Sequence, residues 1–253
     1  MDRSAFYTAI RPLFGGKLTQ QQVDGLEVLL AECEARGADL YQTAYICATA
    51  FGETGGAMQP VRENMNYSPK RIPEVFSASR RQGVPTYQLA HNPRLLANTV
   101  YGGDWGRKHL GNTEPNDGWN FRGGLIGQTT GRANYKMTGD KLGVDLIGNP
   151  ALIDDPKIAA RAIVRGMLEG WHGNKHPLSA YVNENEAPDY IGARAIWNGN
   201  FEATKYAGYA QKFEAALKAG GYSPKKAPAE QNGIAATIVA FIKAIAAALG
   251  GNV

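Results

Sequence analysis

Cysteine and histidine are scarce in this chain, and neither forms a pattern typical of a metal site. There are two cysteines, Cys33 and Cys47, and four histidines among 253 residues. No CxxC pair occurs, and the histidines at helical spacing, His172 and His176, are separated by Gly173, which favours a loop. We therefore expect two buried thiols, no disulfide framework, no metal and no other cofactor.

A dense basic stripe and an export signal are also missing. The formal net charge of +4 is a mild excess of lysine and arginine, which does not indicate a nucleic-acid partner. Such a charge is compatible with an anionic polymer or an envelope surface. Residues 1–16 lack a long apolar core and a small-residue cleavage site, so we expect synthesis in the cytoplasm without a cleavable signal peptide.

Short segments with apolar residues at helical spacing, separated by glycine and proline, make up most of the chain. Thr19 to Gln22 resembles a capping box that opens a helix. Only residues 118–126 have strand or hairpin character. The predicted class is mainly α with a small irregular β element. Two helices are expected in residues 1–36, and a buried helix leads to Glu53. Further helices are expected at 69–77, 93–100, 131–142, 156–171, 187–197 and 203–219.

A change in composition divides the chain near its C-terminus. Residues 1–222 have the pattern of a globular domain, residues 223–232 that of a linker, and residues 233–250 that of an apolar helix. The large apolar residues of the last segment follow one helical stripe, but it is shorter than the roughly 20 residues that span a bilayer and contains Lys243. We expect membrane contact in the interface or as a thin span, with docking onto the domain as the alternative.

Glu53 stands where a buried helix must stop. The run before it, LYQTAYICATAF, is small or apolar on nearly every side, and Gly55 and Gly56 follow as helix terminators. A carboxyl at the negative end of the helix dipole, partly removed from water, is favoured in its protonated form. This suits a proton donor, while a glutamate that caps a surface loop or pairs with an arginine is the alternative.

Two later blocks combine aromatic residues with amides, which suits sugars because they present apolar faces and hydroxyl edges together. Residues 116–135 read NDGWNFRGGLIGQTTGRANY, and residues 196–200 read IWNGN. With LFGGKLTQQQVDGL, ATAFGETGG and ENMNYS before them, these blocks resemble the glycoside hydrolases of family 19 over residues 6–219. Within that family, the resemblance is to bacteriophage endolysins and chitinase-like lysozymes.

The resemblance implies a helical, two-lobed, lysozyme-like fold and an inverting acid/base mechanism. Glu53 matches the general acid, Glu63 is the candidate general base, and Thr130 matches the hydroxyl that positions water. Thr130 and Asn134 could instead cap the following helix. The residues implied in substrate binding are Tyr67, Trp119, Arg122, Gln128, Asn134 and Asn198.

Two positions depart from the family pattern. Gly124 stands where the family usually has a second arginine, which alters the electrostatics near the acid. The nearest match to an arginine late in the domain is Lys205, which keeps the charge but loses the planar fork.

The resulting hypothesis is a phage or prophage endolysin that hydrolyses the glycan strands of peptidoglycan. It is expected to act as a monomer at the bacterial cell wall or periplasm. A chitinase acting on N-acetylglucosamine polymers is one alternative, and a catalytically weak wall-binding module is another.

Overall fold

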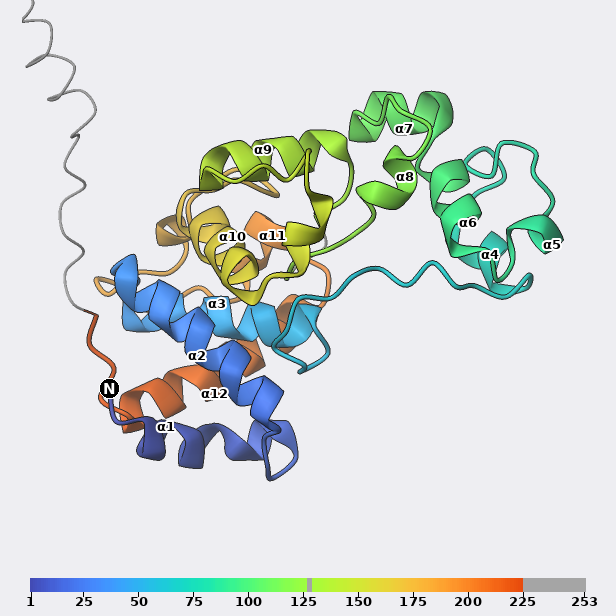
Figure 1. Ribbon diagram of the computed structural model, residues 1–253. Coiled ribbons are helices and arrows are strands. Elements are labelled where there is room, and N and C mark those ends of the chain that lie inside the picture. The colour runs from blue at the N-terminus through green and yellow to red at the C-terminus, as the bar shows by residue number, and fades with distance from the viewer. Residues whose placement is uncertain (127–128, 225–253) are drawn as a thin grey trace, which may run out of the picture.

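The computed structural model describes residues 1–126 and 129–224 of the 253-residue chain (Figure 1). Within them the β pairing consists of one isolated antiparallel bridge, between Gly124 and Thr129. The predicted mainly α class is confirmed. The helices are α1 (Arg3–Ile10), η1 (Arg11–Phe14), α2 (Gln20–Ala35), α3 (Leu40–Glu53), α4 (Arg71–Val75), α5 (Thr86–Leu89), α6 (Pro93–Val100), α7 (Gly103–Leu110), α8 (Asp117–Asn120), α9 (Arg132–Leu142), η2 (Pro150–Asp154), α10 (Pro156–Leu168), η3 (Leu178–Ala180), η4 (Gly192–Arg194), α11 (Ala195–Asn198) and α12 (Ala203–Ala219).

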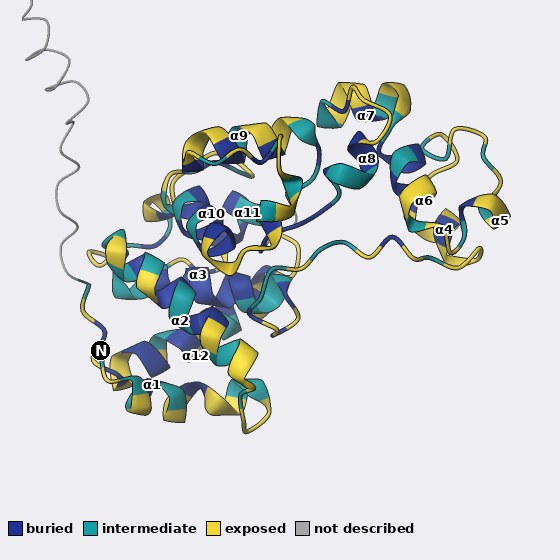
Figure 2. Cartoon of the chain, viewed as in Figure 1, coloured by how far each residue is buried: buried dark blue, intermediate teal, exposed yellow. Residues whose placement is uncertain are grey.

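The larger of two lobes is built around α3. Every residue from Thr43 to Ala50 is buried, which confirms the buried helix predicted from the all-round apolar run (Figure 2). Helix α12 packs along α3 and against α1, while α10 packs on α2 and α3. A helix that is apolar on every side needs such neighbours around it, because none of its faces suits water.

Short-range signals set the ends of these helices. Thr19 and Gln22 form the predicted capping box, in which the Thr19 N–H donates to Gln22 Oε1 at 2.8 Å and the Gln22 N–H donates to Thr19 Oγ1 at 3.2 Å. Helix α3 ends at Glu53, and both Gly55 and Gly56 have positive φ, at 58° and 83°. This backbone favours glycine, so the predicted stop signal is confirmed.

The smaller lobe contains α4 to α8 and has its own core. Figure 1 shows it beside the larger lobe, joined to it by the segments that precede α4 and follow α8. The two lobes predicted from the family resemblance are therefore present. The buried residues of this second core are Met65, Ile72, Phe76, Leu89, Leu96, Ala97, Val100 and Tyr101.

The strand or hairpin predicted at 118–126 is largely wrong. Residues 117–120 form the short helix α8, and β structure is reduced to the bridge at Gly124. The Asp117 carboxylate accepts hydrogen bonds from the N–H groups of Thr113 and Glu114, at 2.8 and 2.9 Å. These bonds stabilise a turn at the start of α8, which is not compatible with an extended strand there.

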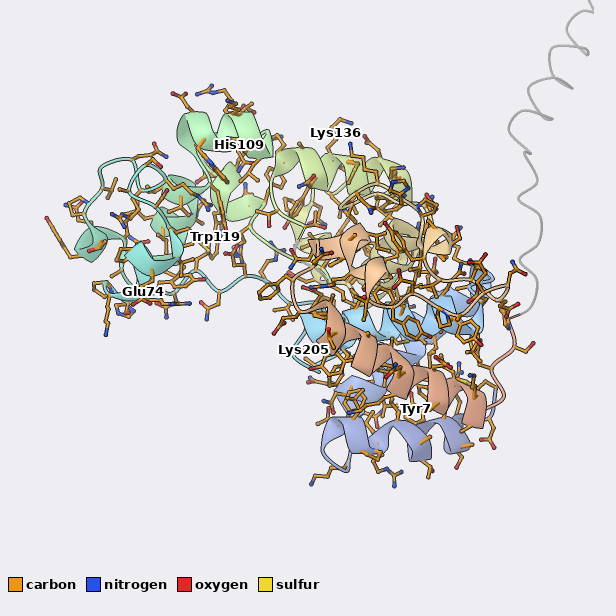
Figure 3. All side chains as sticks on the ribbon, turned by 180° about the vertical axis from the view of Figure 1, so that it is seen from behind. Tyr7, Glu74, His109, Trp119, Lys136 and Lys205 are labelled. Atoms are coloured by element: carbon orange, nitrogen blue, oxygen red, sulfur yellow. The ribbon has the colours of Figure 1, made fainter. Side chains whose placement is uncertain are left out.

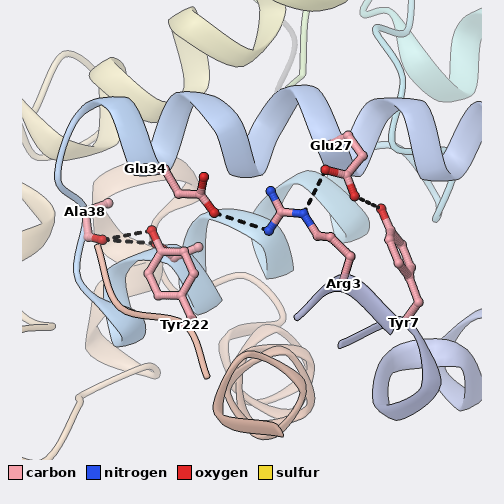
Figure 4. A network of polar contacts seen from close by, with 7 residues as sticks. Arg3, Tyr7, Glu27, Glu34, Ala38 and Tyr222 are labelled. Carbon is pink, nitrogen blue, oxygen red and sulfur yellow. Dashed lines mark hydrogen bonds and ion pairs between the residues drawn. The ribbon is translucent and has the colours of Figure 1, made fainter. Parts of the chain in front are cut away.

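The ends of the described domain are tied to its centre. Arg3 pairs with Glu27 at 2.9 Å and with Glu34 at 3.2 Å, and the Tyr222 hydroxyl donates to the Ala38 carbonyl at 3.0 Å (Figure 4). Helix α1 is thus fastened to α2, and the chain after α12 is fastened to the turn that leads into α3.

Both cysteines are buried free thiols, as predicted, and burial raises the pKa of Cys47 to about 12. The apolar segment 233–250, and the linker from residue 225 onward, lie outside the described residues. Across residues 1–126 and 129–224, every helix is too short or too polar to cross a bilayer.

Candidate active site

Glu53 is held by two residues that follow it far along the chain. Its side chain is only 15% exposed, and Oε1 lies 2.8 Å from Arg194 Nη1 at the end of η4. The Tyr206 hydroxyl, in α12, donates to the same oxygen at 3.1 Å. The Arg194 guanidinium also lies 3.6 Å from the centre of the Tyr206 ring. The end of α3 is therefore clamped by the last part of the larger lobe.

Arg194 itself is fixed within the lobe. Its side chain is 1% exposed, and its Nε donates to the Phe201 carbonyl at 3.1 Å. The contact with Glu53 is a close ion pair whose N–H direction does not meet hydrogen-bond geometry. Pairing with an arginine, the alternative considered for Glu53, is thus realised, but in a largely buried pair rather than on the surface.

Gly52 makes room for this arrangement. A Cβ at this position would lie 2.4 Å from a carbon of the Tyr206 ring, closer than atoms can approach. The glycine beside the candidate acid is therefore required by the ring that binds the acid. The sequence pattern indicated helix-ending roles for Gly55 and Gly56 but no role for Gly52.

Glu63 lies in the segment that joins the two lobes. Its N–H donates to the Gly123 carbonyl at 2.7 Å, and the Gly123 N–H donates to Glu63 Oε2 at 3.2 Å. The Tyr101 hydroxyl of the smaller lobe lies 2.7 and 2.9 Å from the two carboxylate oxygens. Because a phenol has one proton, it donates to one of these oxygens at a time.

The Thr130 hydroxyl and the Glu63 carboxylate both lie close to Gly123. A Cβ built on Gly123 would be 3.3 Å from Glu63 Oε2 and 3.3 Å from Thr130 Oγ1. Any side chain at position 123 would therefore press on both groups. The N-cap of α9 is Gly131, one residue after Thr130. The carboxylate and the hydroxyl assigned to water activation are brought together.

The predicted sugar-binding residues lie in several places. Tyr67 is half-buried, and burial, followed by the negative charge of Glu63, raises the pKa of its phenol. Asn198 is exposed at the end of α11, and exposed Asn134 donates to the Thr130 carbonyl at 2.8 Å. Gln128 lies outside the described residues. Their binding roles stay predictions.

Trp119 is labelled in Figure 3. It forms a stacked pair with Arg122, whose guanidinium lies 3.6 Å from the centre of the Trp119 ring. With Arg62 and Asp154, which pair at 2.9 Å, they line a cavity of about 380 Å³ that neither candidate carboxylate lines. A larger cavity of about 590 Å³ lies along α9 and contains no predicted site residue.

The two departures from the family pattern have structural explanations. A Cβ on Gly124 would lie 3.0 Å from Ile153 Cδ1, so an arginine there would displace that side chain. Lys205 pairs with Glu202 at 3.0 Å on the surface, and the cation beside Glu53 is Arg194. Lys205 is therefore not the cation beside the candidate acid; Arg194 is. The sequence signal for Arg194 was an arginine directly before the AIWNGN block.

The comparisons with known proteins agree with the motifs. No protein-family model matches the chain. Over 132 residues it is 29% identical to a "Glycosyl hydrolase family 19 domain-containing protein" of Haemophilus influenzae (strain ATCC 51907 / DSM 11121 / KW20 / Rd). The match covers 51% of this chain and 64% of that protein.

Two solved structures are similar as well. A bacterial family 19 chitinase, at 18% identity and a TM-score of 0.44, covers 90% of this chain and 98% of its own. Chitinase C from Streptomyces griseus HUT6037, at 16% identity and a TM-score of 0.41, covers 87% and 77%. The sequence match to the Haemophilus protein confirms the resemblance of this chain to glycoside hydrolase family 19.

Proposed function

We propose that this protein is a glycoside hydrolase that cleaves the glycan strands of bacterial peptidoglycan, as an endolysin. The observation that carries the proposal is that Glu63 Oε2 and Thr130 Oγ1 each lie 3.3 Å from the place where a Cβ on Gly123 would stand, in a chain whose other candidate carboxyl, Glu53, is largely buried against Arg194. A carboxylate and a hydroxyl around one point can hold and activate a water molecule. The second carboxyl can protonate a leaving oxygen.

The reaction would proceed by a single displacement. Glu53 donates its proton to the glycosidic oxygen as the bond to the anomeric carbon breaks. Water held by Thr130 attacks that carbon from the opposite side and gives its proton to Glu63, so configuration inverts. Arg194 and the Tyr206 hydroxyl stabilise the Glu53 carboxylate that remains. We predict that the two carboxyl groups are about 6.5–9.5 Å apart, which leaves room for this water.

Peptidoglycan is favoured as the substrate by the endolysin-like motifs and by the net charge of +4, which attracts an anionic cell wall. We propose action as a monomer at the cell wall or periplasm after synthesis in the cytoplasm. A chitinase would use the same carboxyls and differ in whether the cleft admits the lactyl-peptide branch of muramic acid. A weak wall-binding module would bind the glycan without cutting it.

Replacing the proposed proton donor tests the chemistry. Glu53→Gln keeps the size of the side chain but cannot donate a proton, so the lysis rate should fall about a hundredfold or more. The measurement is turbidity loss of purified peptidoglycan, beside turnover of a chitin oligomer. Glu74→Gln is the matched control, because Glu74 is an exposed glutamate paired with Arg71 on the smaller lobe (Figure 3).

The outcomes separate the three functions. Loss of turbidity without chitin turnover supports the endolysin, and the reverse supports the chitinase. Binding to peptidoglycan without release of soluble fragments supports the wall-binding module. Wild-type lysis by Glu53→Gln would show that Glu53 is not the acid.

A further inference from the structure

The Tyr101 hydroxyl links the smaller lobe to the candidate general base. It lies 2.7 Å from Glu63 Oε1 and 2.9 Å from Oε2, and the phenol is buried. The backbone around Glu63 is already fixed by its pairing with Gly123. The carboxylate, however, sits at the end of a side chain with several rotatable bonds, so a second donor is needed to hold both oxygens in one orientation.

Arg80 packs against the Tyr101 ring and binds the backbone next to it. Its guanidinium carbon is 5.1 Å from the centre of that ring, 4.0 Å from Trp105 and 5.2 Å from Phe76. Its Nε donates to the Val100 carbonyl, next to Tyr101, at 3.2 Å. A cation among three aromatic faces and bound to the adjacent backbone gives the ring little freedom to turn.

Two hydrogen bonds connect the backbone of Tyr101 to the start of α9, close to Thr130 in the sequence. Its carbonyl accepts a hydrogen bond from Asn112 Nδ2 at 2.8 Å, and Asn112 Oδ1 accepts one from the Arg132 N–H at 2.8 Å. Arg132 is the first residue of α9, two positions after Thr130. Tyr101 of the smaller lobe therefore contacts the base through its side chain, and its backbone is linked to the start of α9 through Asn112.

We propose that Tyr101, held by Arg80, is a positioning residue that orients Glu63 toward the attacking water. The inference rests on the proposed function, in which Glu63 is the base. The phenol keeps Oε2 beside Thr130 Oγ1, and because it comes from the smaller lobe, the placement of that lobe sets the geometry of the base.

Tyr101→Phe separates this role from packing, because it keeps the ring and removes only the hydroxyl. The value of kcat for peptidoglycan should fall about ten- to a hundredfold, since misplacing a catalytic group costs this much. KM should stay within about twofold, because substrate contacts are unchanged. Arg80→Met should lower kcat in the same direction, and Arg80→Lys, which keeps a cation over the rings, should restore part of it.

Tyr190→Phe is the matched control. The Tyr190 hydroxyl donates to Glu214 Oε2 at 2.9 Å, which is another tyrosine–glutamate bond, made away from the site. Its kcat should equal that of the wild type. A melting temperature is measured for each variant, so that loss of fold is seen separately from loss of rate.

The outcomes also separate this inference from the proposed function. If the wild type cleaves glycan, Glu53→Gln does not, and Tyr101→Phe keeps the wild-type kcat, the positioning role is wrong and the function stands. A rise in KM with unchanged kcat would likewise overturn it, because it would assign Tyr101 to substrate binding. If the wild type cleaves neither peptidoglycan nor chitin, both proposals fail.

Discussion

At the scale of single residues, Arg194 is the charged partner of the candidate acid, Glu53. It is a buried cation, and the carboxyl of Glu53 is the acidic group it meets at ion-pair distance among the described residues. Burying a charge is costly unless it is paired, and removing one member of a buried pair leaves the other uncompensated. The two residues are therefore expected to depend on each other for both stability and placement.

Arg194→Met tests this dependence. It should lower the free energy of unfolding by about 3 kcal/mol, near the low end for a buried pair, because Tyr206 still donates to Glu53. Lysis should fall at least about tenfold, because the carboxylate left after proton donation loses its cation. Urea denaturation and turbidity loss measure the two effects.

Lys205→Met is the control for the corrected assignment. Its surface pair with Glu202 should be worth about 0.5 kcal/mol or less, and activity should be unchanged. If Lys205→Met abolished lysis and Arg194→Met did not, the assignment of the catalytic cation to Arg194 would be wrong.

At the scale of elements, one ion pair fastens α8 to the start of α9. Asp117 is 1% exposed, and Arg132 contacts its two oxygens at 2.7 Å each. Burial alone would raise the pKa of the Asp117 carboxyl, but the hydrogen bonds from Arg132 and from two backbone N–H groups outweigh it and lower the pKa. The two lobes are joined at this point by a charge pair whose carboxylate is buried and whose arginine is 29% exposed.

The lowered pKa predicts a pH dependence of stability. A carboxyl whose pKa is depressed by folding contributes stability that is present above its unfolded pKa, near 3.9, and is lost as pH falls through the folded value. Asp117→Asn should lower the free energy of unfolding by about 3 kcal/mol at pH 7, because Arg132 loses its partner. The difference from the wild type should shrink below about pH 4, where the unfolded carboxyl gains a proton, and should vanish once the pH falls below the folded pKa and the folded carboxyl is neutral as well.

Asp140→Asn is the comparison for this measurement. Asp140 pairs with Lys136 at 2.7 Å within α9, but both side chains are well exposed. Loss of this pair should lower the free energy of unfolding by about 0.5 kcal/mol or less, and the difference from the wild type should be nearly the same at pH 7 and pH 3. Equal effects of the two substitutions in urea denaturation at pH 7 and pH 3 would contradict the role given to Asp117.

At the scale of the whole molecule, the site depends on how the lobes meet. Glu53 belongs to the larger lobe, Tyr101 to the smaller one, and Glu63 to the segment between them. A shift of one lobe relative to the other would change the distance between acid and base. The charge pair at Asp117 and the phenol of Tyr101 both resist such a shift.

The segment beyond the described domain carries a separate prediction, made from its sequence. The apolar stripe in residues 233–250 should make the full chain sediment with anionic liposomes, whereas a chain ending at Tyr222 should stay in solution. Phe241→Asp in the full chain should weaken sedimentation, because it places a charge on the stripe. Equal sedimentation of the full and shortened chains would show that the segment does not contact membranes.

The sequence by itself determined the features that depend on residues a few positions apart. The capping box at Thr19, the stop of α3 at Glu53 and the burial of α3 all follow from local hydrogen bonds, glycine conformation and apolar spacing. The motifs also predicted Glu53, Glu63 and Thr130 as a group, and the structure places Glu63 beside Thr130. Short α8 was missed because its start depends on the Asp117 side chain rather than on periodicity.

Only the tertiary structure decided which groups surround each carboxyl. Tyr206 lies 153 residues after Glu53 and Tyr101 lies 38 residues after Glu63, so no spacing in the sequence relates them. The sequence pattern indicated only Lys205 as the late cation. In the fold Arg194 lies beside Glu53, with its guanidinium stacked on Tyr206, while Lys205 pairs with Glu202. The partners of the two carboxyls depend on how α12 and the smaller lobe pack against the other helices. This packing is a property of the whole core, and local sequence patterns do not predict it.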